Sequence, residues 1–485
     1  MKPIRPWSAL LASVALAGCS LAPPYARPTS PDATQWKPVD GWQPAAPGDG
    51  APRGDWWKDF GDATLDDLVV REHAHNQTLA QAEATYRQAR ALTREARASL
   101  FPTVSATGSV THSASGGSRT IVTNGVSSAA GARASTSYNA GLSASWAPDL
   151  FGEIRNTVAT QRFTEQSRGA DLASAQLALD GELVTNYLGL RASDAQIVSL
   201  AATVAAYQRS LTIATNRYNA GIVAHSDVFQ GQSQLASAQS DLEGEKRTRA
   251  QLEDAIATLI GENAAVFTLP AIADWKPVIP TVPVALPSTL LERRPDIASA
   301  ERLVAAANAQ IGVDRAAFFP SLSLSGSGGF NSDTLSSLFN SASSLWSVGA
   351  SLAQTIFDAG ARRARVAGSR AAYDAAVANY RQVTLTAFQA VQDNLAATAI
   401  LARQEALLTT ASVAADRSEA AVRFQYQSGI VVYSDVVTAQ ATAFAARRAL
   451  IQIRADRQTT AAALVQALGG GWSGVYGTTF GQSYP

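Results

Sequence analysis

The chain has 485 residues, and its 39 lysine and arginine side chains balance 39 aspartate and glutamate side chains, so its formal net charge is zero. This balance leaves no excess of basic residues for nucleic acid, and we expect no nucleic-acid partner. The sequence has four histidines and one cysteine, and it contains no nucleophile motif or glycine-rich phosphate loop. We therefore expect no enzyme, no cofactor and no metal site.

The chain begins with a targeting segment. Lys2 and Arg5 precede an apolar run that is too short to cross a bilayer as a helix, and Leu16-Ala17-Gly18-Cys19 follows. Small residues before a cysteine resemble the lipobox of bacterial lipoproteins, although an ordinary secretory signal is the alternative. Cys19 is the only cysteine and has no disulfide partner, which favours lipidation, with palmitate among the expected acyl groups.

A proline-rich tether follows Cys19 and ends near residue 55. A helical pattern begins at Trp56 and runs to about Leu100. His73 and His75 lie in this helix, but side chains two positions apart on a helix point in different directions. We therefore expect two exposed histidines rather than a shared metal site.

Four segments then alternate apolar residues with small polar ones over about ten positions each, which predicts strands with two different faces. They begin near residues 103, 138, 321 and 346, and we expect a loop rich in Gly, Ser, Thr and Ala between the first two. A half-buried soluble sheet is one explanation. The polar face, however, carries hydroxyls and almost no charge, which favours the wall of an outer-membrane barrel.

Four strands cannot close a transmembrane barrel, because the smallest such barrels have about eight strands. Open sheet edges are also excluded from lipid. The barrel must therefore be shared between chains. Two chains would give eight strands and three would give twelve, and the residues alone leave both possibilities open.

Long helices account for most of the remaining chain. No proline occurs between Pro148 and Pro270, or between Pro320 and Pro485, so helix breakers are absent over two long stretches. A helix from about Phe151 to Tyr218 would be about 100 Å long. Apolar residues recur at seven-residue spacing, which predicts coiled-coil packing; they are Leu183, Leu190, Ile197, Val204, Leu211 and Tyr218, and then Leu401, Leu408, Ala415 and Val422.

The stretch from Arg217 to Val228 returns, with seven identical residues, from Gln425 to Val436. Each copy places a glycine just past a helix end, where the left-handed conformation is common. A serine that could cap the next helix and an aspartate for its first turn follow; these residues are Gly221, Ser226 and Asp227 in the first copy and Gly429, Ser434 and Asp435 in the second. Each copy is therefore predicted to be the tip of a helical hairpin.

The duplication extends beyond the tips, because SLFPTVSATGS at 99–109 is answered by AFFPSLSLSGS at 317–327. The predicted organisation is a signal peptide (1–18), a lipidated tether (19–55), a first repeat (56–269), a connector (270–287), a second repeat (288–468) and a flexible tail (469–485). Pro295 and Asp296 suit the first turn of a helix after the connector.

Several segments together resemble the TolC-like outer-membrane factors, in particular the lipoprotein branch typified by OprM and NodT. They are the lipobox at Cys19, the segment from Trp56 to Phe60, the stretch from Glu292 to Gly329, Phe357-Asp358-Ala359-Gly360, and the two tips. The resemblance implies a homotrimer with a twelve-stranded outer-membrane β-barrel, four strands per chain, continued by a long coiled-coil α-helical barrel in the periplasm. It also implies a periplasmic adaptor and an inner-membrane pump, most often of the resistance-nodulation-division type, as partners.

By the same resemblance the tips would dock the adaptor and keep the periplasmic end closed until it engages. The tip residues are Gly221, Ile222, Val223 and Asp227, and then Gly429, Ile430, Val431 and Asp435. For the two glycines and the two aspartates the alternative is turn geometry and helix capping alone, and we favour it for the aspartates. The closed end in this family is narrowed by acidic and apolar residues just before the second tip. Here the candidates are Asp416, Glu419 and Arg423, and Arg423 departs from the family pattern, in which an acid stands six residues before the glycine.

The resemblance favours an exit duct for drugs or other small toxic compounds. Two alternatives remain: an outer-membrane duct for type I protein secretion, and a structural outer-membrane lipoprotein without transport. Turnover of a substrate by the purified protein would point instead to an enzyme. The exported compounds cannot be named from this chain, because the pump selects the cargo.

Overall fold

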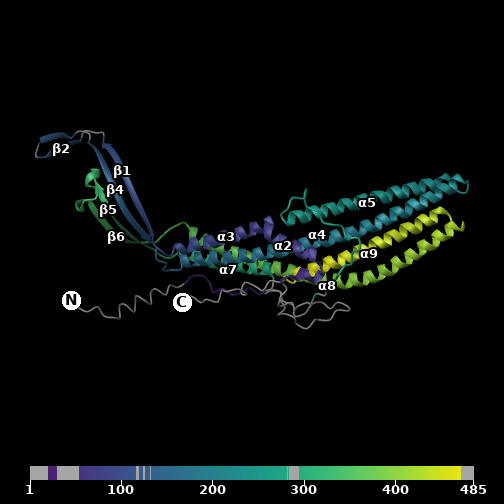
Figure 1. The fold of residues 1–485 in the computed structure, drawn as a ribbon. Coiled ribbons are helices and arrows are strands. Elements are labelled where there is room, and N and C mark those ends of the chain that lie inside the picture. Colours follow the sequence, from purple (N-terminus) through teal and green to yellow (C-terminus); the bar gives the residue numbers. More distant parts are fainter. Residues whose placement is uncertain are drawn as a thin grey trace. The chain divides into compact units, whose positions relative to one another are not determined.

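The computed structural model describes residues 20–29, 54–115, 119–123, 126–130, 133–280, 282 and 294–470 (Figure 1). The predicted signal peptide, the lipidation at Cys19, most of the tether, the end of the connector and the tail after residue 470 lie outside these ranges and stay predictions. The chain forms two compact units, each built from both halves of the sequence. The first comprises Met1–Pro28, Gln88–Glu165 and Arg302–Val377; the second comprises Thr29–Arg87, Gln166–Glu301 and Ala378–Pro485.

The first unit contains a four-stranded antiparallel sheet in the order β1-β4-β5-β6. Its strands are β1 (Thr103–Ser115), β4 (Arg133–Trp146), β5 (Ser321–Ser332) and β6 (Ser344–Ala353). They confirm the four predicted strands. β1 pairs with β4 and β5 pairs with β6 within each half of the sequence, while the β4–β5 pairing joins the halves. β1 and β6 are thus the two edges of this sheet.

The register places the two chemistries of the strands on opposite faces, because successive side chains point to opposite sides of a sheet. Apolar or small residues face each other on each pair of neighbouring strands, as at Val104–Ala144, Leu142–Gly328 and Leu322–Leu352. Hydroxyl residues pair in the same way, as at Ser105–Ser143, Ser143–Ser327 and Ser323–Ser351. The sheet therefore has one mainly apolar face, which the hydrogen-bonded pair His112–Thr136 interrupts, and one mainly hydroxyl face.

The expected loop after the first strand is wrong in part. Two five-residue strands, β2 (Arg119–Thr123) and β3 (Val126–Ala130), pair there as a separate antiparallel hairpin. The run Thr120-Ile121-Val122-Thr123 is entirely β-branched, and such residues favour strands. The abundance of Gly, Ser and Ala around this run concealed the signal.

The single helix expected from Trp56 to Leu100 is also wrong, because three helical segments occupy this stretch. They are the 3-10 helix η1 (Trp56–Phe60) and the α-helices α2 (Ala63–His75) and α3 (Gln77–Ala98). The first break follows from Gly61, which adopts φ 66°, and from Asp62, whose side chain caps α2. At the second break Asn76 is extended; its side chain accepts from the Leu79 amide and donates to the Leu259 carbonyl, which fixes the interruption.

Two helical hairpins confirm the predicted long helices (Figure 1). The first is α4 (Glu153–Asn219) with α5 (His225–Leu259), and the second is α8 (Ala361–Gln427) with α9 (Tyr433–Ala467). The corresponding helices have identical lengths of 67 and 35 residues. A 67-residue helix is about 100 Å long. Both hairpins repeat at an offset of 208 residues (361 − 153 and 433 − 225).

The largest core of the second unit lies where η1 and α2 pack against α4, α5 and α9. It contains Trp56, Trp57, Phe60, Leu65, Leu68, Leu183, Tyr187, Leu190, Ile256, Ile260 and Ala462 among its buried residues. The apolar residues that recur every seven positions along α4 contribute to this core through Leu183 and Leu190, which are fully buried. At the tip end of the same series Tyr218 is exposed. Packing against this series is therefore tightest away from the tip.

The second half of the chain restarts at α7 (Pro295–Ala316). Pro295 is the first helical residue and Asp296 lies in the first turn, as predicted. Between β5 and β6 the chain forms two short 3-10 helices, η2 (Leu335–Ser337) and η3 (Ser341–Ser343).

Candidate functional site

The first candidate site is the turn that joins α4 to α5. Gly221 adopts φ 72°, a conformation that strains residues with a side chain. Its amide donates to the Tyr218 carbonyl at 2.9 Å, and the Ile222 amide donates to the Arg217 carbonyl at 2.9 Å. This pair of bonds closes the last turn of α4 as a Schellman motif.

The turn that joins α8 to α9 has the same construction. Gly429 adopts φ 74°. Its amide donates to the Tyr426 carbonyl at 3.0 Å, and the Ile430 amide donates to the Gln425 carbonyl at 2.9 Å. The predicted left-handed glycines are confirmed in both copies.

The predicted serine caps are wrong. α5 begins at His225 with Ala224 as its N-cap, and α9 begins at Tyr433 with Val432 as its N-cap; neither cap makes a side-chain hydrogen bond. The serines sit one residue inside the helices, and the aspartates follow them in the first turns as predicted. The negative charge of Asp227 and Asp435 thus stabilises the helix N-termini without a side-chain cap.

Both turns present apolar side chains outward. Ile222, Ile430 and Val432 are exposed, whereas Val223 and Val431 are half-buried. Beneath the second turn Ala214, Tyr426, Tyr433, Val436 and Val437 form a buried cluster. The turns are therefore exposed apolar knobs on a packed base, and that arrangement suits docking to another protein. Docking of an adaptor to the predicted tip residues stays a prediction.

A non-covalent contact between the two tips was not predicted. The guanidinium of Arg217, on α4, donates to the backbone carbonyl of Tyr426 at 2.9 Å and lies 4.6 Å from the centroid of its ring. The sequence contained a signal, because Arg217 is one of the positions where the copies differ: the second copy has Gln425 there. We name this contact the Arg217 clamp.

Around the first tip three aromatic rings form a ladder. Tyr218 stacks on His225 with centroids 4.5 Å apart, and His225 lies 4.2 Å from Phe229. The ladder joins the end of α4 to the start of α5. It stiffens the first tip independently of the Arg217 clamp.

The predicted constriction residues do not form one acidic cluster within the chain. Asp416 pairs with Arg447 of α9 at 2.7 Å, and Glu419 pairs with Arg423 at 3.5 Å. Each carboxylate thus has its own arginine nearby, so the excess negative charge on this face of α8 is small. A role of these residues in narrowing a duct stays a prediction.

The hydroxyl face of the sheet is the second candidate site. The four strands of this sheet contain no Asp or Glu, and their only Arg is Arg133 at the first residue of β4. Cross-strand hydrogen bonds link its side chains, including Thr103–Ser145 at 2.9 Å and Ser327–Ser347 at 2.9 Å. A face of this kind offers hydroxyl groups for hydrogen bonds and carries almost no fixed charge, so it would not bind ions strongly.

The expectation that His73 is exposed is wrong. Its Nε2 lies 2.6 Å from a carboxylate oxygen of Asp180, which raises the pKa of the imidazole despite partial burial. Beside it, Glu72 is 1% exposed, and neither of its carboxylate oxygens has a hydrogen-bond partner. Burial, followed by the nearby charges of Asp180 and Glu182, raises the pKa of Glu72 to about 8. His75 is exposed, as predicted.

A buried charged network holds the first part of the connector. The Asp194 carboxylate accepts from Arg191 at 2.9 Å and from Arg249 at 2.7 Å, and it also accepts from the Ile272 amide at 3.1 Å. The two arginines donate to the carbonyls of Pro270 and Leu269. The connector is thus fixed to α4 and α5 at this point. Among the residues that the structure describes, no three His, Cys, Asp or Glu side chains are placed to hold a metal ion.

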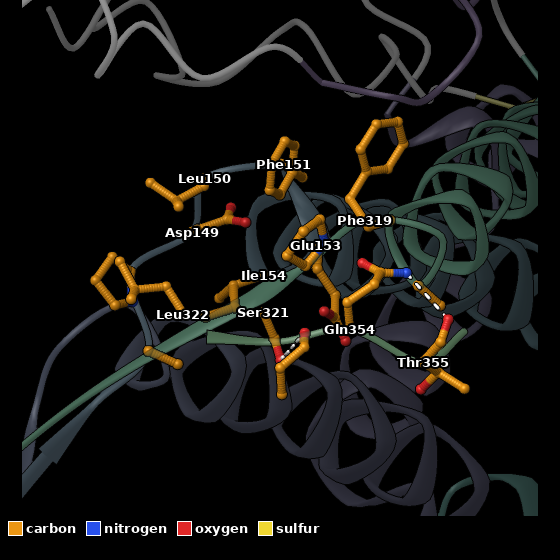
Figure 2. Close-up of a pocket in the computed structure, with 16 residues that line it drawn as sticks. Asp149, Leu150, Phe151, Glu153, Ile154, Phe319, Ser321, Leu322, Gln354 and Thr355 are labelled. Atoms are coloured by element: carbon orange, nitrogen blue, oxygen red, sulfur yellow. Dashed lines mark hydrogen bonds between the residues drawn. The ribbon is translucent and has the colours of Figure 1, made fainter. Parts of the chain in front are cut away.

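At the base of the sheet a pocket of about 440 Å³ lies among the linker from β4 to α4, the start of β5 and the end of β6 (Figure 2). Phe151 of that linker stacks on Phe319, which precedes β5, with ring centroids 4.9 Å apart. Gln354 donates to the Phe318 and Thr355 carbonyls, both at 3.2 Å. Asp149 and Glu153 are the titratable side chains that line the pocket, and Asp149 pairs with Arg155 at 3.0 Å.

Comparison with known proteins places these features in context. Residues 68–262 and 286–470 match the model of the family described as "Outer membrane efflux protein". Outer membrane protein OprJ of Pseudomonas aeruginosa is 32% identical over 475 residues, covering 97% of each chain. The antibiotic efflux pump outer membrane protein ArpC of Pseudomonas putida is 33% identical over 460 residues, covering 94% of this chain and 93% of that protein.

Solved structures agree with this match. The outer-membrane channel OprN superposes with a TM-score of 0.82 at 29% identity, over 94% of this chain and 100% of that one. The MtrE outer membrane channel of Neisseria gonorrhoeae, solved in its open state, gives a TM-score of 0.79 at 28% identity over 93% and 98% of the chains. The predicted four-strand, two-hairpin subunit is thus an outer-membrane channel fold.

Proposed function

Because the chain belongs to the outer membrane efflux protein family, we propose that it is the exit duct through which drugs or other small toxic compounds leave the cell. An inner-membrane pump of the resistance-nodulation-division type would load the duct through a periplasmic adaptor. The duct itself would be passive and catalyse no reaction. Energy would come from the pump.

The observation that carries this proposal is the sheet with two unlike faces and two open edges. Its apolar face suits lipid and its hydroxyl face suits a water-filled lumen. Its edges need partners in a membrane, since unpaired backbone groups are costly there. Three copies would pair every edge and close twelve strands around one lumen. We propose this homotrimer, with Cys19 as its lipid anchor.

The two glycine turns support the adaptor part of the proposal. Each exposes an apolar residue, Ile222 or Ile430, at the end of a hairpin that is fixed by the Schellman bonds. Such rigid apolar knobs can dock without a large loss of conformational entropy. The Arg217 clamp would hold the tips together until docking occurs.

The test is retention of a fluorescent dye in cells that lack this gene, with and without a restored copy. We expect higher retention that the restored copy reverses. Gly429→Ala should restore poorly, because an alanine in the left-handed region costs roughly 1–2 kcal/mol and displaces the knob. Gly244→Ala is the matched control, since Gly244 lies inside α5 with open space around its Cβ position. If cells that lack the gene retain no more dye but no longer release a protein into the medium, the protein-secretion alternative would be favoured.

A further inference from the structure

The sheet edges can be matched in register, because the two halves of the chain are copies. Thr103 of β1 pairs with Ser145 as Ser321 of β5 pairs with Ala353. β5 is therefore the copy of β1 at an offset of 218 (321 − 103), and β6 is the copy of β4 at an offset of 208 (353 − 145). The flanking helices agree: α3 and α7 end 218 residues apart (316 − 98), and α4 and α8 begin 208 apart (361 − 153).

The seam between β4 and β5 joins one repeat to the next within the chain. In this seam the paired residue numbers sum to 470, as at Ser143 and Ser327. If β4 is replaced by its copy β6, and β5 by its copy β1, the same pairing joins β6 to β1. The sum for that pairing is 460 (470 + 208 − 218). β6 is antiparallel to β5, and β5 copies β1, so the new pairing is antiparallel too.

We propose that β6 of one copy pairs with β1 of the next copy in the register in which the residue numbers sum to 460. The inference rests on the proposed homotrimer and specifies its subunit seam. It pairs Ser347 with Ser113, Ser351 with Ser109, and Ala353 with Thr107 on the hydroxyl face. On the apolar face it pairs Trp346 with Ala114, Ala350 with Val110, and Leu352 with Gly108.

The chemistry of the faces is an independent check on this register. A slip by one residue would turn Ser347 and Ser351 of β6 toward the apolar face of β1. A slip by two would keep the faces matched, so the faces alone allow several registers. The internal seam selects one of them, because the same pair of strand types already closes there.

The residues that adjoin the strand ends fit the same register. At the internal seam Phe151 stacks on Phe319, and their numbers also sum to 470. The copy of Phe319 is Phe101, which is 68% exposed within the chain. The copy of Phe151 is Ala359, and the same linker carries Ile356 and Phe357, which are 87% and 85% exposed. In the proposed seam this linker covers Phe101 of the neighbouring copy.

Disulfide cross-linking in isolated outer membranes tests the register. Ser351 and Ser109 are copies of Ser143 and Ser327, which pair inside the chain. The variant S351C/S109C should form covalent dimers and trimers on non-reducing gels after oxidation with copper–phenanthroline. S143C/S327C should form a disulfide within one chain, detected as thiols protected from a maleimide label. Directly paired strand positions are close enough for a disulfide without a backbone shift.

Two shifted variants on the same face are the matched controls. S351C/S105C and S351C/S113C move the β1 cysteine four residues either way, and each should yield at most a tenth of the dimer seen with S351C/S109C. The single variants control for any reaction with Cys19. Equal or stronger cross-linking in a shifted variant would overturn the register. So would the absence of dimers with S351C/S109C while S143C/S327C forms its disulfide.

The linker contact gives a second readout. Phe101→Ala should lower the temperature at which the trimer dissociates on a semi-native gel, without reducing the S143C/S327C disulfide when the two changes are combined. An unchanged dissociation temperature would overturn the part of the proposal that concerns Phe101. Cross-linking is measured independently of dye retention, so failure of the register and failure of the efflux function are distinguishable.

Discussion

Replacing Arg217 by alanine should loosen the closed end of the duct. Arg217 donates a charge-assisted hydrogen bond to the Tyr426 carbonyl, which contributes about 1.5–3 kcal/mol. Its cation–π contact with the Tyr426 ring adds about 0.5–1 kcal/mol, the range for a site that water still reaches. The two contributions sum to about 2–4 kcal/mol, and because contacts that share one side chain do not add fully, we take the lower half, about 2–3 kcal/mol, for the whole clamp. Since each 1.4 kcal/mol is tenfold, the ratio of open to closed ends should rise on the order of 30- to 100-fold.

The open fraction of single channels in planar bilayers measures this change directly. Arg217→Lys should give an intermediate value, because lysine keeps the charge but lacks the planar fork. Tyr426→Phe should leave the open fraction unchanged, since it retains the ring and the backbone carbonyl and removes a buried hydroxyl that has no hydrogen-bond partner. Arg209→Ala, an exposed arginine on the same helix, is the charge-matched control.

Two results would refute this reasoning. An open fraction of Arg217→Ala equal to that of the unaltered protein would show that the clamp does not hold the tips. An equal rise with Arg209→Ala would show that the loss of positive charge, rather than the clamp, is responsible.

Three further predictions concern stability and membrane insertion. Glu72 has a pKa of about 8 in the folded state against an ordinary 4.5, so between these values the folded state keeps a proton that the unfolded state has lost. The contribution of Glu72 to the free energy of unfolding is therefore complete below about pH 4.5, and it falls by on the order of 1 kcal/mol per pH unit up to about pH 8. Urea unfolding of Glu72→Gln should therefore lose this slope, and an unaltered slope would contradict the assignment. Asp194→Ala should cost about 3–5 kcal/mol, because it leaves the buried Arg191 without its carboxylate and removes one of the two carboxylates that pair with the half-buried Arg249; thermal unfolding measures this, with the exposed Asp241→Ala as control. Gly329→Ala should reduce insertion into the outer membrane, since its Cβ would lie 2.5 Å from the Ala140 carbonyl oxygen, whereas Gly328→Ala has open space and should insert normally.

The sequence predicted those features that depend on periodicity. Twofold alternation located all four strands of the main sheet, and proline-free heptads located both 67-residue helices. The tips were also predictable, because only a left-handed residue such as Gly221 ends a helix in a Schellman motif. These signals are local, and each is repeated in the second half of the chain.

Features that depend on tertiary contacts were missed. The break at Asn76 exists because its side chain reaches the Leu259 carbonyl, 183 residues away. His73 is half-buried because Asp180 of α4 lies beside it. The Arg217 clamp needs two hairpins to pack together. No spacing along the chain encodes such partners, although the difference between Arg217 and Gln425 was visible.

That difference has a consequence for where the closed end separates. Arg217 of the first tip holds the second tip of the same chain, and the equivalent contact of Gln425 would be with the Tyr218 carbonyl of the next copy's first tip. Glutamine lacks the guanidinium charge, so the contact between copies should be weaker than the contact within a copy, and opening should break this contact together with the Arg217 clamp. Gln425→Arg should therefore add a clamp between copies and lower the open fraction about tenfold, from about 1.5 kcal/mol for one charged hydrogen bond. Gln425→Leu is the control of similar size. An open fraction unchanged by Gln425→Arg, while Arg217→Ala raises it, would show that opening breaks only the contact within each chain.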